Sequence, residues 1–100
     1  MIARVLLDLN NPVFQQEWLA LEREEAISVL ATLRKIRLLD WEQLYRDKGL
    51  HWEAINSRSG PAGKRIYSLR ITRSMRAVAS REGDFLRLLS THADHDSAYR

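Results

Sequence analysis

The last ten residues of the chain, THADHDSAYR, hold side chains that can transfer protons. They include His92, His95, Asp96 and Tyr99. A histidine titrates near neutral pH and can act as base or acid within one turnover, and a nearby aspartate can orient its ring. A tyrosine can stack on a nucleobase or hydrogen-bond to a phosphate. We therefore predict these four residues as candidates for a catalytic site, against the alternative that each is an ordinary solvated or packed side chain.

The residues before this segment supply positive charge. The segment YSLRIT alternates apolar and polar side chains, as a β-strand with one covered and one uncovered face does. If the next strand pairs with it across a short turn, Arg76 lies beside Arg70, and Arg87 of a third strand joins them. Neighbouring guanidinium groups repel one another unless an anion lies between them, and phosphate accepts their forked hydrogen bonds. The alternation predicts an uncovered, polar sheet face that binds phosphate or, in the simpler interpretation, one that arginines merely keep soluble.

A metal site is the other chemistry that the segment HADHD permits. His92 and His95 together with a carboxylate could bind zinc, but they lack the i, i+4 spacing of helical zinc ligands, and the chain has no cysteine. We predict no metal and no cofactor. The lack of cysteine also excludes disulfides and thiol catalysis.

Composition restricts the partners that such a site would serve. Of the 100 residues, 45% are hydrophobic and 29% are charged, which is typical of one globular domain over residues 1–100. No apolar run reaches membrane-spanning length, and MIARVLLDLN is too short for a signal peptide, so we predict a cytoplasmic protein with no membrane contact. The first 57 residues carry 7 basic and 9 acidic side chains, whereas the others carry 9 basic and 4 acidic. The basic second half favours a polyanionic partner such as nucleic acid.

Periodicity predicts the elements that position these residues in the first half of the chain. Residues 3–9 indicate a strand, and Asn11 followed by Pro12 is typical of a helix start. A second helix carries an apolar stripe, which consists of Ala26, Val29, Leu30, Leu33 and Ile36. Residues 40–55 give a weaker signal of another helical turn, a break at Gly49 and then an irregular or helical piece.

The second half changes to the period of two that strands show. After a loop over residues 56–65, three strands over residues 67–72, 75–80 and 85–92 form an antiparallel meander with a hairpin at Gly83. We therefore predict an α+β fold in the order β-α-α-β-β-β. Its two helices pack on one face of a four-stranded, mainly antiparallel sheet.

The order of these elements and the segment IYSLRITRSMRAVASREGDFLRLLSTHADHDSAY resemble the RelE/ParE superfamily of bacterial toxins. The likeness covers nearly the whole chain in architecture and is concentrated over residues 64–99 in sequence. It implies the toxin of a type II toxin–antitoxin system. RelE-type members cut mRNA on the ribosome with the ribose 2′-hydroxyl as nucleophile, leaving a cyclic phosphate, whereas ParE-type members poison DNA gyrase without hydrolysis.

The resemblance also implies roles for individual residues. Arg70 resembles the basic residue of the first meander strand, and Arg76 the arginine that grips the scissile phosphate. Tyr99 resembles the tyrosine near the end of the family's chains, and His92 and His95 resemble histidines of some nuclease members. The further RNA-binding candidates are Lys64, Arg65, Arg73 and Arg87. Ser68 departs from the family, because many nuclease members have a lysine there.

We predict a ribosome-dependent mRNA endoribonuclease in which Arg70 and Arg76 bind phosphate, a histidine transfers protons and Asp96 orients it. The alternatives are a gyrase-binding toxin and an inactive relative that only binds its antitoxin. The resemblance implies a cognate antitoxin as partner, with operator DNA bound only through the antitoxin complex. A groove between the helix pair and the sheet edge would suit an antitoxin segment, by helix packing or strand addition.

Overall fold

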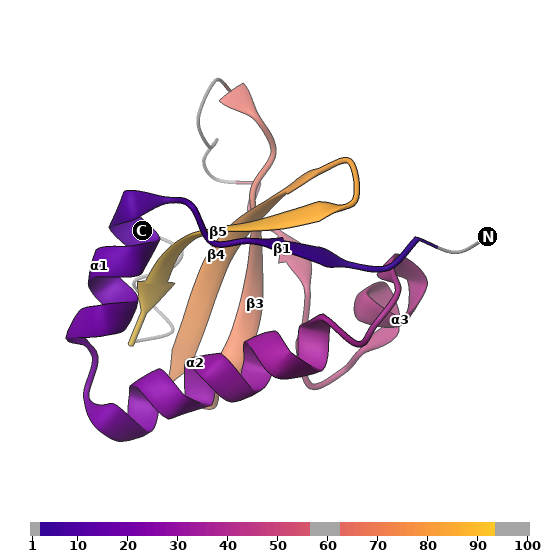
Figure 1. The fold of residues 1–100 in the computed structure, drawn as a ribbon. Helices are drawn as coiled ribbons and strands as arrows, with labels where there is room; N and C mark the ends of the chain where they lie inside the picture. Colours follow the sequence, from indigo (N-terminus) through magenta and orange to yellow (C-terminus); the bar gives the residue numbers. More distant parts are fainter. Residues whose placement is uncertain (1–2, 57–62, 94–100) are drawn as a thin grey trace.

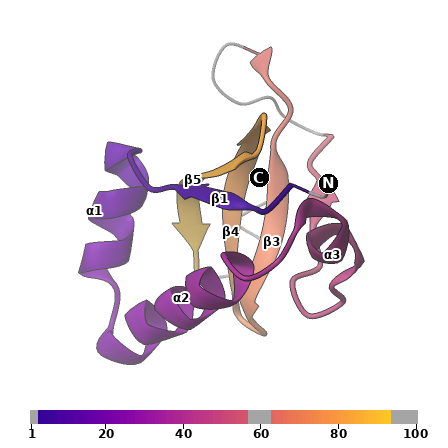
Figure 2. The same ribbon diagram turned by 45° about the vertical axis from the view of Figure 1, so that its right-hand side comes forward.

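The computed structural model describes residues 3–56 and 63–93 and arranges them as three helices beside one sheet (Figure 1). The elements in chain order are β1 (Leu6–Asp8), α1 (Pro12–Ala20), α2 (Arg23–Ile36), α3 (Trp41–Arg46), β2 (Glu53–Ala54), β3 (Tyr67–Thr72), β4 (Met75–Glu82) and β5 (Phe85–His92). Figure 2 shows α2 crossing in front of the sheet, with α1 beside β5 and α3 at the opposite end of the molecule. The fold is α+β, as predicted.

The strands lie in the order β1-β5-β4-β3-β2. The predicted antiparallel meander is confirmed in β3, β4 and β5, and β1 pairs in parallel with β5. The prediction of a four-stranded, mainly antiparallel sheet is wrong in one respect. The two-residue strand β2 pairs antiparallel with β3 and makes the sheet five-stranded, while the parallel pairing of β1 with β5 makes it mixed. Two residues are too few to show an alternating pattern, so periodicity could not reveal this strand.

Asn11 starts α1 as predicted. Its side-chain oxygen accepts hydrogen bonds from the backbone N–H groups of Val13 at 2.8 Å and Phe14 at 3.3 Å, and Pro12 is the first helical residue. Phe14 is fully buried, and its ring stacks with that of Trp18 with 5.9 Å between the centroids. The cap therefore sets the rotation of the helix that places this aromatic face against the core.

The apolar stripe predicted for α2 is confirmed at three of its five positions, and Ala26 is only half-buried. Val29, Leu33 and Ile36 are buried, but Leu30 is 44% exposed, and Thr32 is buried instead. Positions 29, 32, 33 and 36 share one side of a helix, whereas position 30 lies at its margin. The hydroxyl of Thr32 donates to a backbone carbonyl one turn earlier, at 3.1 Å, which satisfies it inside the core.

A third helix, α3, follows its capping residue Asp40, where the sequence indicated only a helical turn. The Asp40 carboxylate accepts from the Gln43 N–H at 2.8 Å, and the Gln43 side chain accepts from the Asp40 N–H at 2.9 Å. This reciprocal capping box stabilises a helix of six residues, and it buries Trp41 and Leu44. Within the two described ranges, no helix is both long and apolar enough to cross a membrane.

The main core lies between the helices and one face of the sheet, where Phe14, Val29 and Leu88 belong to one buried cluster. A second, smaller cluster joins Ile55, Ile66 and Val78. Register places Val78 and its partner Ser68, which is also fully buried, on the other face of the sheet. The prediction of a wholly uncovered polar face is therefore wrong. Only part of that face is polar and accessible, because strand alternation says nothing about what covers each face.

Asp47 anchors the loop that follows α3. Its carboxylate accepts the N–H of Leu50 at 2.9 Å and pairs with the Lys35 ammonium of α2 at 3.0 Å. Burial alone would raise the pKa of this carboxyl. The hydrogen bonds from Leu50, Lys35 and Gly49, together with the charge of Lys35, outweigh burial and lower the pKa of Asp47 below its ordinary 3.8.

We expect Asp47→Asn to lower the free energy of unfolding at neutral pH by about 1 kcal/mol, because the neutral amide loses these charge-assisted hydrogen bonds. A carboxyl whose pKa is lower in the folded chain stabilises the fold above its unfolded pKa, and this contribution is lost as pH falls through the folded pKa. The gap between variant and wild type should therefore shrink below about pH 4. Urea unfolding of both proteins at neutral pH and at about pH 3 measures the difference in their free energies of unfolding. An equal difference at the two pH values would contradict this account.

Candidate functional site

The register of the sheet brings three predicted site residues into one row. Arg70 on β3 pairs with Arg76 on β4, and Arg76 pairs with His92 on β5. Residues that pair in this way project to the same face, with Cβ atoms about 4.5–5.5 Å apart. The predicted closeness of Arg76 to Arg70 is thus confirmed. We call Arg70, Arg76 and His92 the cationic row, and each of its members is half-buried, neither sealed inside nor free in solvent.

A β-bulge decides that His92 belongs to this row. Leu88 lies opposite Ala79 on the core side of the sheet, but the next pair is Ser90 with Val78 on the other side. One residue of β5 is therefore extra at this point. Strict alternation from Leu88 would turn the side chain of His92 into the core. The extra residue reverses the alternation and places His92 on the face of Arg76.

Ser90 is a site residue that the sequence analysis missed. Its hydroxyl oxygen lies 3.0 Å from Nε2 of His92, two residues along the same face of β5. A hydrogen bond at this distance holds the imidazole in one orientation beside the arginines. The signal in the sequence is that Ser90 and His92 are two residues apart in the segment STH. This spacing is informative only when it is known that both lie on one face of a strand.

The other arginines predicted to bind RNA lie at different places. Arg73 is exposed in the turn between β3 and β4, at the end of the hairpin that carries the row. Arg87 pairs with Ser80 and lies 3.7 Å from the carboxylate of Asp8. Because Ser80 is four residues from Arg76 on β4, Arg87 is about 13 Å from the row along the strand. The prediction that Arg87 joins the other two arginines is therefore wrong.

Lys64 and Arg65 do not extend the row either. The ammonium of Lys64 forms an ion pair with the carboxylate of Glu82 at the last residue of β4. Arg76 is near the first residue of the same strand, so the two cations lie at opposite ends of it. Arg65 is exposed. The local charge of Lys64 is thus already balanced within the protein.

Three predicted catalytic residues, His95, Asp96 and Tyr99, lie outside the residues that the structure describes. Their roles stay predictions. The zinc interpretation of HADHD involves the same segment. Over residues 3–56 and 63–93, no three histidine, aspartate or glutamate side chains come close enough together to hold a metal ion.

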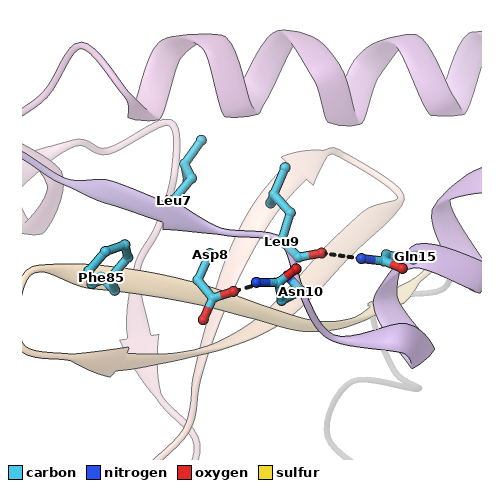
Figure 3. Close-up of a pocket in the computed structure, with 6 residues that line it drawn as sticks. All are labelled: Leu7, Asp8, Leu9, Asn10, Gln15 and Phe85. Carbon is cyan, nitrogen blue, oxygen red and sulfur yellow. Dashed lines mark hydrogen bonds between the residues drawn. The ribbon is translucent and has the colours of Figure 1, made fainter.

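A pocket of about 540 Å³ lies beside β1 and the start of α1 (Figure 3). Its lining residues are Leu7, Asp8, Leu9, Asn10, Gln15 and Phe85. Its polar groups hydrogen-bond to one another, because the Asn10 N–H donates to Asp8 at 3.0 Å and the Gln15 amide donates to the Leu9 carbonyl at 2.7 Å. None of the described site residues lines this pocket. Its polar groups stabilise the turn from β1 into α1.

Two grooves of about 310 Å³ flank α2. One lies between α2 and β3, where Thr32 and Lys35 face Arg70 and Thr72. It corresponds to the predicted groove between the helices and the sheet edge, and Arg70 is the one member of the cationic row among its lining residues. The other groove lies between α1 and α2 and is apolar, lined by residues that include Trp18, Leu19, Ile27 and Leu30.

Comparison with known proteins leaves the family of the chain open. No protein-family model matches the sequence, and no curated protein matches it. Among solved structures, the chain is similar to a copper-bound mutant toxin from Helicobacter pylori. The identity is 19% and the TM-score 0.49, over 96% of this chain and 98% of that chain. A likeness of this size assigns neither family nor function, so the functional argument depends on the residues of this chain.

Proposed function

We propose that this protein is the toxin of a type II toxin–antitoxin system and that it cleaves mRNA on the ribosome. The observation that carries the proposal is the cationic row, in which two guanidinium groups and an imidazole share one face of three adjacent strands. This set supplies both requirements of phosphodiester cleavage, which are positive charge around a phosphate and a group that transfers protons. The resemblance of residues 64–99 to the RelE-type toxins supports the choice of mRNA as substrate.

In the proposed reaction, the ribose 2′-hydroxyl attacks the adjacent phosphorus, and the bond from phosphorus to the 5′-oxygen breaks. Arg70 and Arg76 contact the non-bridging oxygens, whose negative charge increases in the transition state. His92 takes the proton of the 2′-hydroxyl or gives a proton to the departing 5′-oxygen. The products are a 2′,3′-cyclic phosphate and a free 5′-hydroxyl.

Ser90 acts through His92 in this scheme. Its hydroxyl, at 3.0 Å from Nε2, keeps the ring from turning away from the arginines. The strands on both sides of Arg76 fix the backbone of the row. A site on paired strands holds its groups more firmly than one on a loop, and the transition state gains most from groups that are placed before the substrate binds.

The cognate antitoxin is the proposed partner. The groove between α2 and β3 is open and includes Arg70 among its lining residues. An antitoxin segment in this groove would contact Arg70, one member of the cationic row. Binding of the antitoxin would then also inhibit cleavage, because it would engage Arg70.

Induction of the protein in a bacterial host, followed by pulse-labelling of protein and of DNA, tests the proposal. We expect protein synthesis to stop before DNA synthesis, and we expect His92→Ala to relieve the arrest. The matched control is His51→Ala, which removes an exposed histidine that pairs with Glu53 at 3.3 Å outside the row. If protein synthesis continues, or if both histidine variants behave alike, the cleavage function is wrong.

Gyrase binding is the second candidate function, and one position favours it. Ser68 is fully buried, on the same face of the sheet as Arg70. The sheet therefore presents no lysine where many nuclease members of the resembling superfamily have one. A toxin of this type would arrest DNA synthesis first. An inactive relative would leave growth unchanged, so the same induction separates the three functions.

A further inference from the structure

An arginine and two aromatic rings form a second ordered cluster near the β4–β5 hairpin. The guanidinium carbon of Arg81 lies 4.0 Å from the ring centroid of Trp41 and 5.8 Å from that of Tyr45. One guanidinium nitrogen donates to the Tyr45 hydroxyl at 3.0 Å, and Nε donates to the carbonyl of Gly83 at 2.9 Å. We call Arg81, Trp41 and Tyr45 the stacking cluster. The Arg81 guanidinium packs on the Trp41 ring and donates hydrogen bonds to the Tyr45 hydroxyl and the Gly83 carbonyl.

The base of this cluster is rigid. Trp41 is 4% exposed, and its indole N–H donates to the carbonyl of Asp84 in the hairpin at 3.0 Å. Its ring also lies 5.9 Å from that of Trp52, which in turn stacks on Tyr67 at 4.6 Å. The cluster thus rests on α3, on the hairpin and on a row of packed rings. Arg81 cannot leave its place without breaking contacts to two elements.

The top of the cluster is accessible. Arg81 is exposed, and Tyr45 is 49% exposed. The guanidinium carbon lies over the Trp41 ring, so we infer that the accessible surface of Arg81 is the side away from Trp41. A planar cation with one open face is what a nucleobase stacks on, and free guanidinium N–H groups bind the phosphate beside it. Because folding has already ordered the side chain, binding would cost little further conformational entropy.

A purely structural role accounts for only part of these observations. An apolar side chain at position 81 would cover Trp41 equally well. It would not place a charged, hydrogen-bonded guanidinium group at the surface. The excess positive charge of the chain, with a net value of +3 and a pI near 9.7, favours a polyanion as the molecule that covers it.

We propose that Arg81 and Tyr45 form a stacking site for an unpaired base of a single-stranded nucleic acid. The site is separate from the proposed cleavage site. Arg81 pairs with Leu86, which belongs to the main core, so Arg81 lies on the helix-covered face of the sheet, whereas the cationic row lies on the other face. The inference therefore goes beyond the proposed function and does not depend on it.

Tryptophan fluorescence tests the proposal, because a base that stacks on Arg81 lies above Trp41. The probe is a short 2′-O-methyl oligouridine, which lacks the 2′-hydroxyl and cannot be cut by the proposed reaction. We expect the oligonucleotide to quench the wild-type protein, and we expect Arg81→Lys to weaken binding about five-fold or more although it keeps the charge. Arg37→Lys, at an exposed arginine elsewhere, is the matched control and should bind as the wild type does. Equal binding by both variants, or no quenching of the wild type, would overturn the proposal.

A second measurement uses the unaltered protein and so does not depend on the folding of a variant. Oligouridine that contains 4-thiouridine is irradiated with the wild-type protein, and the cross-linked tryptic peptides are identified. We expect the peptide of residues 38–46, which contains Trp41 and Tyr45, to carry the cross-link. A duplex of the same sequence should compete poorly, since its bases are not free to stack. Cross-links confined to other peptides would refute the site even if the protein cleaves mRNA.

Discussion

Arg76→Ala is expected to reduce mRNA cleavage by purified protein and ribosomes about 100-fold to 1,000-fold. Arg76 is the central member of the cationic row, with Arg70 on one side and His92 on the other. In the proposed reaction, its removal takes one of the two cations away from the pentacovalent phosphate and leaves His92 in place. The loss should therefore fall on the rate of the chemical step. Single-turnover cleavage of a labelled message on programmed ribosomes measures that rate.

Two further variants distinguish charge from geometry. Arg76→Lys keeps the charge but loses the forked donors, so it should fall between the wild type and the alanine variant. Arg37→Ala removes an exposed arginine at the end of α2, away from the row, and should cleave at the wild-type rate. Thermal unfolding of all variants shows whether each is folded at the assay temperature. If folded Arg76→Ala cleaves mRNA as fast as the wild type, the assignment of this row to catalysis is wrong.

Phe14→Ala is expected to be the most destabilising single truncation in α1, by about 3–5 kcal/mol. The Phe14 ring is fully buried, and it stacks with Trp18 where α1 meets the sheet. Truncation removes this apolar surface from the core and leaves a cavity that the capped helix cannot collapse to fill. Urea unfolding monitored by circular dichroism measures the change in the free energy of unfolding.

The neighbouring position provides the control. Val13 is 54% exposed on the same helix turn, so Val13→Ala should change the free energy of unfolding by no more than about 0.5 kcal/mol. Because a domain of this size has a total stability of only about 5–15 kcal/mol, Phe14→Ala can approach the limit of folding. Phe14→Leu then serves as the milder variant. Similar losses at positions 13 and 14 would show that α1 does not pack as described.

The local signals in the sequence determined much of the fold. Asn11 before Pro12 marks the start of α1, because only a short polar side chain accepts the first free N–H groups of a helix. Gly83 marks the β4–β5 hairpin, where its φ of +62° is a conformation that few other residues adopt. These features depend on neighbouring residues alone. The turn at residues 73 and 74 predicts the β3–β4 hairpin, but it does not by itself pair Arg70 with Arg76. In unbroken register position 71 would lie opposite position 76, and a register shift between Arg70 and Thr72 places Arg70 there instead.

The tertiary structure decided what the periodic pattern could not. Strand β2 exists only because β3 offers it an edge, and the second buried cluster exists because the other sheet face is covered around Val78. Neither the strand β2 nor the second buried cluster can be predicted from the periodicity of apolar residues along the chain. For the same reason the stacking cluster was invisible in the sequence, because Trp41 and Arg81 are 40 positions apart.

His92 shows the difference between the two sources most clearly. Its residue type identified it as a proton-transferring group, because the titration of an imidazole near neutrality is a property of the side chain itself. The sheet face on which His92 lies could not be predicted from alternation, because strict alternation from Leu88 would place His92 on the core face. The bulge after Leu88 turns His92 to the face of Arg76 and within 3.0 Å of the Ser90 hydroxyl. The sequence by itself named Arg70, Arg76 and His92 as candidates. Register shifts in the β3–β4 and β4–β5 pairings, which depend on packing across the whole sheet, decided that the three share one row.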